Sequence, residues 1–355
     1  MTALAGKRVL ITGGTGSLGT VLVRRLLSGE LGTPESITVF SRDEAKQHVM
    51  RLAHQNQKTA TDEVIYHNFE QLLRFQIGDV RSYPSIASAL RTADVVFNAA
   101  ALKQVPTCEY FPFEAVQTNI VGAENIVRAI REHELPVETV VGISTDKAAK
   151  PVNVMGMTKA IQERLFIRAN LDVPGTRFVC ARYGNVLASR GSVIPLFLQQ
   201  IATGGPVTIT SVEMTRFLLS LDEAVDTVLA ALRDGQRGDL YVPQVPSARV
   251  RDIAGVMIGD RPIETVVTGI RPGEKVHEIL VSEEEAHRTI ARDGYYVVLP
   301  LLPELREPGA LVEQALETEF SSADVLMDRD ALADYLGRHR LLPDEELVLE
   351  EELLL

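Results

Sequence analysis

Cysteine is scarce in this sequence, and no apolar run is long enough to cross a bilayer. The 355 residues contain two cysteines, Cys108 and Cys180, and show neither a disulfide framework nor the ligand spacing of a metal site. We expect a protein of a reducing compartment, with the cytoplasm as the default location. Residues 7–11 follow the N-terminus without a signal-peptide pattern, so we also expect no membrane association.

Positive charge is also in short supply. Lys and Arg number 36 against 48 Asp and Glu, a formal net charge of -12, which disfavours nucleic acid as a partner. The composition is 45% hydrophobic and 24% charged, as in ordinary globular proteins. A chain of this length can form one large α/β domain with a smaller partner.

A glycine-rich turn separates the first predicted strand from the first predicted helix. Its residues are Gly13, Gly14, Thr15, Gly16, Ser17, Leu18 and Gly19. Such glycines let the backbone approach a pyrophosphate, whose charge meets the helix N-terminus. A tight turn without a ligand is the alternative, but the flanking strand and helix favour a dinucleotide site.

A polar stretch after a buried strand is the second candidate site. The β-branched run at 138–143 predicts a parallel strand that leads into Thr145, Asp146 and Lys147. Open α/β sheets bind their ligands at this edge. Lys159, on the next predicted helix, can point back to the same place, which would bring together groups for proton transfer. The alternative is a solvated polar turn, and the phosphate-binding turn argues against it.

The order of elements predicts an α/β fold, a doubly wound parallel sheet of the Rossmann type. Strands are expected at 7–12, 36–40, 73–77, 94–98, 138–143 and 178–182, and helices at 114–133 and 154–171. Beyond residue 187 the elements become short. We therefore predict a cofactor domain at 1–187, completed by a strand near 238–243. A smaller α/β substrate domain at 188–340 and an acidic, leucine-rich tail at 341–355 follow, and 55–70 is expected to be an inserted loop.

The choice between NAD and NADP depends on the end of the strand at 36–40, which meets the adenosine ribose in dinucleotide folds. Ser41, Arg42 and Lys46 favour a 2′-phosphate and therefore NADP, while Asp43 lies one residue past the usual NAD contact. Alternatively, the two basic residues only solvate the start of a helix.

Other strand ends supply further candidate cofactor contacts. Asp79 is placed to meet the adenine amino group, and small alanines let the chain pass close to the cofactor. The complete set of these candidates is Asp79, Val80, Ala99, Ala100, Lys103, Thr118, Asn119, Lys159 and Tyr183. In the C-terminal part, Arg190, Arg216 and Arg271 lie on predicted turns. Each alone reads as a surface charge, but together they suit an anionic substrate on an acidic chain.

Several short motifs together go beyond a dinucleotide fingerprint. They are FSRDE from Phe40, AAALKQVP from Ala99, STDKA from Ser144, RYGNV from Arg182, SRGSVIP from Ser189, MTRF from Met214 and RPGEK from Arg271. This set resembles the extended short-chain dehydrogenase/reductase family, and within it the soluble UDP-N-acetylglucosamine 4,6-dehydratases, over residues 7–336. The resemblance implies a tightly held, recycled NADP, a UDP-sugar substrate and a homo-oligomer. It also implies substrate contacts from Lys103, Asn185, Arg190, Val193, Thr208, Met214, Arg216, Arg271 and Glu274.

One position departs from the wider family. Met155 occupies the place of the tyrosine in Tyr-x-x-x-Lys, whose phenolate would take the proton of the sugar 4-hydroxyl. A subset of the dehydratases resembles this chain in carrying Met there. We expect Lys147 to remove the C5 proton and Asp146 to protonate the C6 leaving group, with Thr145 holding the 4-hydroxyl and Lys159 the nicotinamide ribose. Thr145, Asp146 or a water would replace the phenol, and we expect burial to outweigh the attraction within the Asp146–Lys147 pair.

Rival activities share the same fold. A 4-epimerase would return the hydride to C4 without an Asp–Lys pair, a reductase would consume NADPH, and a 5,6-dehydratase is also compatible. A protein silenced by Met155 would be an NADP-binding scaffold, but retention of Asp146, Lys147 and Lys159 argues against it. The soluble dehydratases that this chain resembles look inverting, which favours inversion at C5 here, although residue types do not fix the stereochemistry.

Overall fold

The computed structural model describes residues 2–55, 71–187, 192–306 and 313–343. The predicted insertion at 56–70, Arg190 and the tail from residue 344 lie outside the described residues. The main sheet is built from β1 (Arg8–Thr12), β2 (Ser36–Ser41), β3 (Leu73–Ile77), β4 (Val95–Asn98), β5 (Thr139–Thr145), β6 (Arg177–Tyr183), β9 (Leu240–Pro243), β13 (Thr289–Arg292) and β14 (Tyr295–Val298).

The sheet has the doubly wound order that the sequence predicts. Its strands run β13-β14-β9-β6-β5-β4-β1-β2-β3, and the first six strands and β9 are parallel. The order reverses at β1, where β2 and β4 lie on opposite sides, so the carboxyl ends of β1 and β4 border the crevice in which such folds bind ligands. The Rossmann-type fold class is confirmed.

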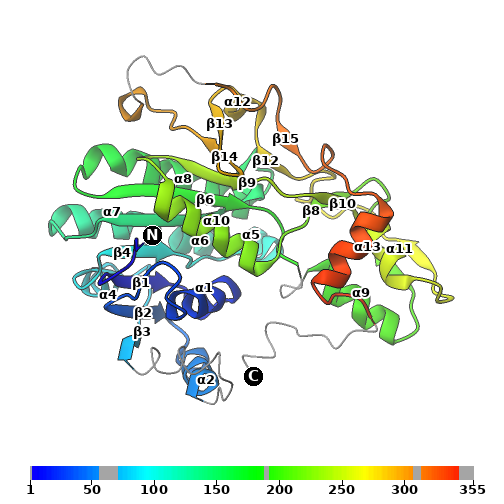
Figure 1. The fold of residues 1–355 in the computed structure, drawn as a ribbon, viewed down its shortest axis with the longest axis horizontal. Helices are drawn as coiled ribbons and strands as arrows, with labels where there is room; N and C mark the ends of the chain where they lie inside the picture. The colour runs from blue at the N-terminus through cyan, green and yellow to red at the C-terminus, as the bar shows by residue number, and fades with distance from the viewer. Residues whose placement is uncertain (1, 56–70, 188–191, 307–312, 344–355) are drawn as a thin grey trace.

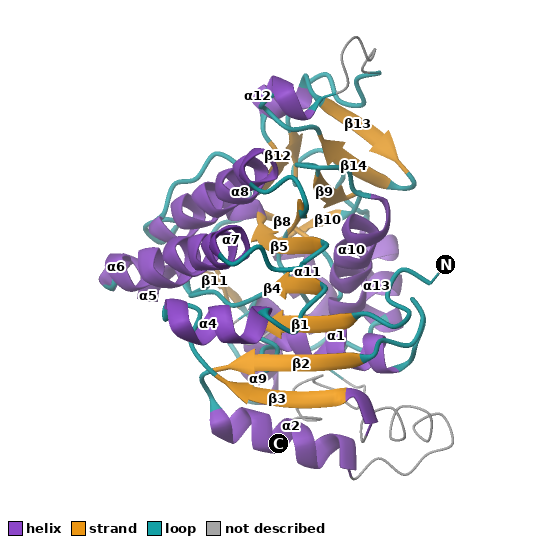
Figure 2. Cartoon of the chain, turned by 90° about the vertical axis from the view of Figure 1, so that its left-hand side faces the viewer, coloured by secondary structure: helices purple, strands orange, loops and turns teal. Residues whose placement is uncertain are grey.

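Helices cover both faces of the sheet, as Figure 2 shows. On one face α4 (Tyr83–Leu90), α7 (Gly122–Glu132) and α8 (Val154–Asp172) bury Ile86, Ile126 and Phe166. On the other face lie α1 (Ser17–Leu27) and α10 (Leu221–Asp234). Because both faces are covered, β5 is buried over six of its seven residues, which explains the apolar run at its centre.

The helix predicted at 114–133 is part of a longer helical run with an irregular centre. The run begins with α6 (Pro112–Ala115), passes through a π-helical turn (Val116–Val121) and continues as α7. Two further helices, α2 (Glu44–Gln55) and α5 (Val105–Tyr110), precede it in the chain. A π-helical turn widens the helix locally and is frequent at functional sites. Here it carries Thr118 and Asn119, two of the predicted cofactor contacts.

A second core lies in the C-terminal part, at the right of Figure 1. Its elements are α9 (Val193–Ala202), β7 (Val207–Ile209), β8 (Thr215–Phe217), β10 (Ser247–Arg249), α11 (Val250–Ile258), β11 (Thr265–Val267) and α13 (Arg329–Arg338). Phe197, Met257 and Leu332 are fully buried within it. Strand pairs β10–β8 and β11–β7 connect these elements.

The C-terminal part also contributes to the main sheet. The predicted strand near 238–243 is β9, which pairs with β6. The hairpin β13–β14, which extends the sheet with antiparallel strands, was not predicted. The chain thus crosses between the two parts more than once, and the division at residue 187 stays a prediction.

The last elements connect the hairpin region to the site. They are β12 (Ile279–Val281), α12 (Glu283–Ala286), a 3-10 turn (Pro303–Leu305) and β15 (Phe320–Ser321), which pairs with β12. Among the described helices, none has the length and apolarity needed to cross a bilayer.

Candidate active site

The glycine turn after β1 has the shape required to hold a phosphate. Gly13 has a φ of 67°, and a Cβ on it would lie 2.7 Å from the backbone of Ala100. A Cβ on Gly19 would lie 2.5 Å from Gly14 Cα, so α1 can pack this closely on the turn only with glycine at that position. The turn therefore brings the N-terminus of α1 to the strand edge with its backbone accessible, which fits the pyrophosphate of a dinucleotide.

A single cavity extends from this turn to the C-terminal part. Its volume is about 730 Å³, which is large enough for a cofactor and part of a second ligand. Predicted cofactor and catalytic residues that line it are Gly13, Thr15, Gly16, Ser17, Leu18, Gly19, Ser41, Arg42, Asp43, Lys46, Asp79, Val80, Ala99, Ala100, Lys103, Thr118, Thr145, Asp146, Lys147, Met155, Lys159 and Tyr183. Predicted substrate residues that line it are Lys103, Asn185, Arg216, Arg271 and Glu274.

Four residues predicted as ligand contacts do not line this cavity, and their side chains make other contacts, so their ligand roles stay predictions. Asn119 is fully buried and holds the backbone N–H and C=O of Leu102 at 2.8 and 3.0 Å. Thr208 accepts a hydrogen bond from Gln200, while Met214 and Val193 pack in the C-terminal core. Of the four, Asn119 contacts a residue of the cavity lining, Leu102. Arg190 lies outside the described residues.

The turn after β5 is fixed by close packing against α8. Thr145 Oγ1 accepts a hydrogen bond from the backbone N–H of Lys147, which starts a 3-10 turn over Asp146–Ala148. A Cβ on Gly156 would lie 2.1 Å from the Lys147 carbonyl oxygen, so α8 can approach the turn only with glycine there. Asn153 caps α8 by accepting from Gly156 N at 2.8 Å. The turn is therefore held in place by the following helix.

Two carboxylates flank the Lys147 ammonium group. Its Nζ lies 3.1 and 3.3 Å from the two oxygens of Asp146, and 3.5 Å from Glu278 Oε1. Asp146 is completely buried and also accepts a hydrogen bond of 2.7 Å from the Thr145 hydroxyl. Arg216 Nε lies 3.8 Å from the same Glu278 oxygen. These residues form one charged cluster in the cavity wall.

The expectation that burial would outweigh attraction in the Asp146–Lys147 pair is wrong for Lys147. Burial lowers the pKa of this amine, but the negative charges of Asp146 and Glu278 outweigh burial and raise the pKa above its usual value. The sequence prediction considered one carboxylate, and the structure places two beside the amine. Lys147 is therefore an ammonium in this state and must lose a proton before it can act as a base.

Lys159 behaves in the opposite way. It is 5% exposed, and its Nζ donates to Gln162 Oε1 at 2.8 Å. Among the described residues no carboxylate forms an ion pair with it, although the charge of Glu163 acts on it from nearby. Burial lowers the pKa of Lys159 to about 8. Because this pKa still lies above neutral pH, most of the amine remains protonated there, and it lines the cavity.

The position of the missing tyrosine is occupied by an inert side chain. Met155 is 5% exposed and packs against Cys108 and Ala115 at the cavity wall. Its thioether has no proton to exchange. Tyr183 also lines the cavity, but burial raises the pKa of its phenol, which disfavours the phenolate. The part of the chain that the structure describes therefore supplies Thr145, Asp146 and the two lysines for proton transfer.

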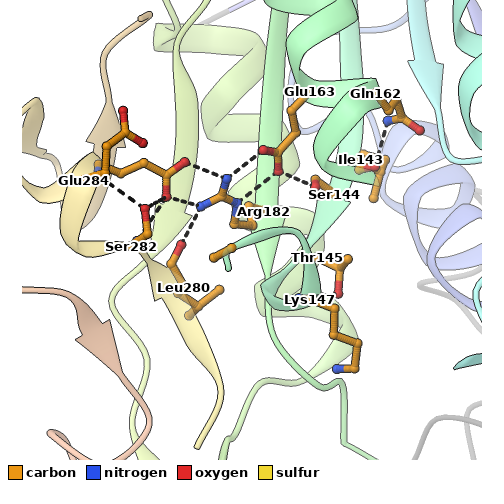
Figure 3. Close-up of polar contacts among 12 residues, drawn as sticks. Ile143, Ser144, Thr145, Lys147, Gln162, Glu163, Arg182, Leu280, Ser282 and Glu284 are labelled. Carbon is orange, nitrogen blue, oxygen red and sulfur yellow. Dashed lines mark hydrogen bonds and ion pairs between the residues drawn. The ribbon is translucent and has the colours of Figure 1, made fainter. Parts of the chain in front are cut away.

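A buried ionic network lies directly behind the cluster (Figure 3). Arg182 is 1% exposed and binds Glu163 and Glu285 with two hydrogen bonds each, between 2.6 and 2.9 Å. It also donates to the carbonyl oxygen of Leu280, on β12, at 2.8 Å. Ser144 donates to Glu163 from the residue before Thr145. The network thus ties β5, β6, α8 and β12 together beside the site.

The end of the cavity beside β2 and β3 is lined by Arg42 and Asp79, and Arg81 binds this aspartate. Arg81 makes a bidentate contact with Asp79, with distances of 2.7 and 2.9 Å to Oδ2 and 3.1 Å to Oδ1. Burial favours protonation of Asp79, but the hydrogen bonds from Arg81 outweigh it and lower the pKa of Asp79. Arg42 is 3.9 Å from Asp79 and more than half exposed. Its guanidinium can therefore turn toward a ligand at the ribose position.

Sequence reasoning missed two polar residues that line the cavity. Glu278 Oε2 and the Ser192 hydroxyl are buried and have no hydrogen-bond partner within the described ranges. Glu278 follows the RPGEK motif by three residues, so proximity to that motif was the available signal. Asn185, which was predicted, likewise has a buried Oδ1 without a partner in the described chain. Buried polar atoms of this kind are normally satisfied by a ligand or water.

Comparison with known proteins identifies the family. Residues 9–300 match the family described as polysaccharide biosynthesis protein. The chain belongs to this family. A UDP-glucose 4-epimerase of Rickettsia conorii is 46% identical over 295 residues, which covers 82% of this chain and 82% of the relative.

Solved structures confirm the type of fold. The X-ray structure of Pen from Bacillus thuringiensis is 31% identical, with a TM-score of 0.83 over 96% of this chain and 99% of that chain. The dTDP-glucose 4,6-dehydratase DesIV of Streptomyces venezuelae, solved with NAD, has 20% identity and a TM-score of 0.62, over 76% and 86% of the two chains. This polysaccharide biosynthesis protein therefore has the extended short-chain dehydrogenase/reductase fold of nucleotide-sugar epimerases and dehydratases.

Proposed function

We propose that this protein is an NADP-dependent UDP-N-acetylglucosamine 4,6-dehydratase that works as a cytoplasmic homo-oligomer. The observation that carries the proposal is the charged cluster at the cavity wall, in which Asp146 and Glu278 hold Lys147 next to Thr145. Dehydration moves a proton from C5 and another to the C6 oxygen, in addition to the proton of the 4-hydroxyl. The cluster provides an acid and a base for these two extra transfers.

The residues around the cavity fit the cofactor and the nucleotide. The glycine turn would hold the pyrophosphate, Lys159 the nicotinamide ribose, and Arg42 with Lys46 the 2′-phosphate that distinguishes NADP. The bound nicotinamide supplies the chemistry of accepting a hydride from C4 and returning it to C6. Arg216, Arg271 and Asn185 line the C-terminal end, where they would meet the UDP group.

The first proton transfer requires a substitute for the missing phenol. The Thr145 hydroxyl donates to Asp146 Oδ1 at 2.7 Å, so it can pass a proton from the sugar 4-hydroxyl to Asp146. Asp146 then holds the proton that the C6 hydroxyl needs in order to leave as water. On this route Asp146 is charged beside Lys147 before C4 oxidation and protonated afterwards, so the two states that it needs occur at different stages. Lys159, held by Gln162, would stabilise the developing negative charge on O4.

A UDP-glucose 4-epimerase is the second candidate, because relatives 44–46% identical carry that name. An epimerase oxidises C4 and reduces it again on the other face, so it leaves C5 and C6 untouched. It would have no task for an acid beside a base at the distances seen for Asp146 and Lys147. This difference allows a direct test.

The test is proton NMR of the purified protein with UDP-N-acetylglucosamine, and separately UDP-glucose, in D2O without added reductant. The dehydratase proposal predicts a 4-keto-6-deoxy sugar with deuterium at C5, and the ring couplings then report whether C5 is inverted. Conversion to the 4-epimer with hydrogen retained at C5 would instead establish the epimerase. Unchanged sugars with cofactor bound would refute both activities on these substrates, and Met155→Tyr would show whether the methionine silences the site.

A further inference from the structure

Glu278 occupies a position that the steps above leave without a role. It is 3% exposed, lines the cavity and lies just before β12. Its Oε1 is 3.5 Å from Lys147 Nζ, while Oε2 is buried without a hydrogen-bond partner in the described residues. A carboxylate in such a place is costly to bury unless it has a task or a ligand.

We propose that Glu278 takes the proton of the Lys147 ammonium and thereby makes Lys147 the neutral amine that removes the C5 proton. This inference rests on the proposed dehydratase function. In the step, an N–H bond of Lys147 breaks and an O–H bond forms on Glu278, and the amine keeps the electron pair. No oxidant or reductant is required.

The protonation of Asp146 prepares this transfer. Before the 4-hydroxyl is oxidised, two carboxylates face Lys147, and their charges keep it an ammonium. Once Asp146 has accepted the 4-hydroxyl proton, Lys147 and Glu278 remain as one buried ion pair. In a buried site two charges are expensive, so a neutral amine beside a neutral acid becomes competitive.

Two neighbouring cations influence Glu278 and oppose the transfer. Arg216 Nε lies 3.8 Å from Oε1, and Lys275 lies close enough for the two charges to affect each other. A bound diphosphate would engage Arg216 and weaken its hold on Glu278. The transfer would then be most favourable when the UDP-sugar fills the cavity, which limits proton abstraction to the loaded site.

The proton balance closes over one turnover. Lys147 gains the C5 proton as the C5 electron pair forms the double bond that expels the C6 hydroxyl, and Asp146 gives its proton to make water. C5 later takes up one proton, which the cluster supplies directly or through solvent. Glu278 then returns its proton to Lys147, so all three residues regain their starting states.

The structural position of Glu278 is maintained by the network behind the site. Its backbone N–H donates to Ser322 Oγ at 2.9 Å, and β12, which follows it, is tied to β6 by Arg182 through Leu280 O. The distance from Glu278 to Lys147 is therefore set by rigid elements. A shorter side chain would not follow Lys147 without moving β12.

The proposal predicts that Glu278→Gln separates the two halves of the reaction. The variant keeps the shape of the side chain but cannot accept a proton. In a single turnover in D2O, C4 oxidation is monitored by the nicotinamide absorbance and should proceed at close to the wild-type rate. Appearance of C5 deuterium and of the 6-deoxy product, followed by NMR, should be about 100-fold slower or more.

Glu283→Gln is the matched control, since this glutamate is 77% exposed, lies five positions further along and does not line the cavity. It should behave as wild type in both measurements. If Glu278→Gln fails to fold, Glu278→Asp is used instead, because it retains the carboxyl but withdraws it from Lys147. The same separation is then expected, with a smaller factor.

Three outcomes would overturn the inference. Wild-type C5 deuteration in Glu278→Gln would show that Lys147 loses its proton by another route. Equal slowing of C4 oxidation and C5 deuteration would show a structural role only. Absence of any C5 deuteration in the wild-type protein would remove the proposed function and this inference with it, so the two failures are distinguishable.

Discussion

Replacing Lys159 with Met should make the protein more stable at neutral pH. Lys159 is buried, and its pKa is lowered from 10.5 to about 8 because the loss of water outweighs the attraction of the nearby Glu163. The folded protein therefore binds this proton less tightly than the unfolded chain does. At pH values below its folded-state pKa, the amine is charged in the folded protein, and this buried charge lowers the free energy of unfolding.

The magnitude follows from the pKa difference. The pKa of Lys159 is lower by about 2.5 in the folded protein than in the unfolded chain. At about 1.36 kcal/mol per pKa unit, this difference lowers the free energy of unfolding by about 3 kcal/mol at pH 7. The cost decreases as the pH rises above 8, because the folded protein releases the proton before the unfolded chain does, and falls below about 1 kcal/mol at pH 10. The Lys159→Met variant also loses the hydrogen bond to Gln162, which reduces its increase in the free energy of unfolding by about 1–3 kcal/mol at every pH.

The assay is urea unfolding of cofactor-free wild type and Lys159→Met at pH 7 and pH 10. The difference between the two free energies of unfolding should change by about 2–3 kcal/mol in favour of the wild type on going to pH 10. Lys150→Met is the control: Lys150 lies at the surface and Glu319 raises its pKa, so its contribution stays constant over this range. A constant difference between wild type and Lys159→Met at the two pH values would refute the reasoning.

Three further outcomes are expected. Asp146→Asn and Lys147→Ala should each lower the rate of dehydration about 100- to 10,000-fold while NADP still binds, and near-normal turnover would exclude their assigned roles. Arg42→Ala should weaken NADP binding about tenfold or more and NAD binding much less, which fluorescence titration checks; equal losses would indicate that Arg42 does not meet the 2′-phosphate. Arg182→Met should lower the free energy of unfolding by about 3–5 kcal/mol because the carboxylates of Glu163 and Glu285 stay buried but lose their cation, whereas the surface change Arg233→Met should have little effect in the same urea titration.

Local patterns in the sequence were enough to predict many of the residues that line one end of the cavity. The strand, glycine turn and helix around Gly13 are adjacent in the chain, and the glycines have a backbone requirement that the sequence displays directly. Thr145, Asp146 and Lys147 follow a buried strand, so the rule that parallel sheets bind ligands at their carboxyl edge placed them correctly in the cavity wall. Met155 was likewise recognised from its spacing to Lys159.

Tertiary structure decided what depends on residues far apart in the chain. Glu278 lies just before β12, which Arg182 ties to β6, and it comes within 3.5 Å of Lys147. Together with Asp146, whose charge has the larger effect, it raises the pKa of Lys147, opposite to the direction that the sequence suggested. Asn119 carries an amide suited to a ligand, yet the π-helical turn directs it to the backbone of Leu102. The hairpin β13–β14 pairs with a strand from another part of the chain, and no local pattern specifies such a partner. Residue type and spacing determined which groups this protein has, and long-range packing determined which charges they face.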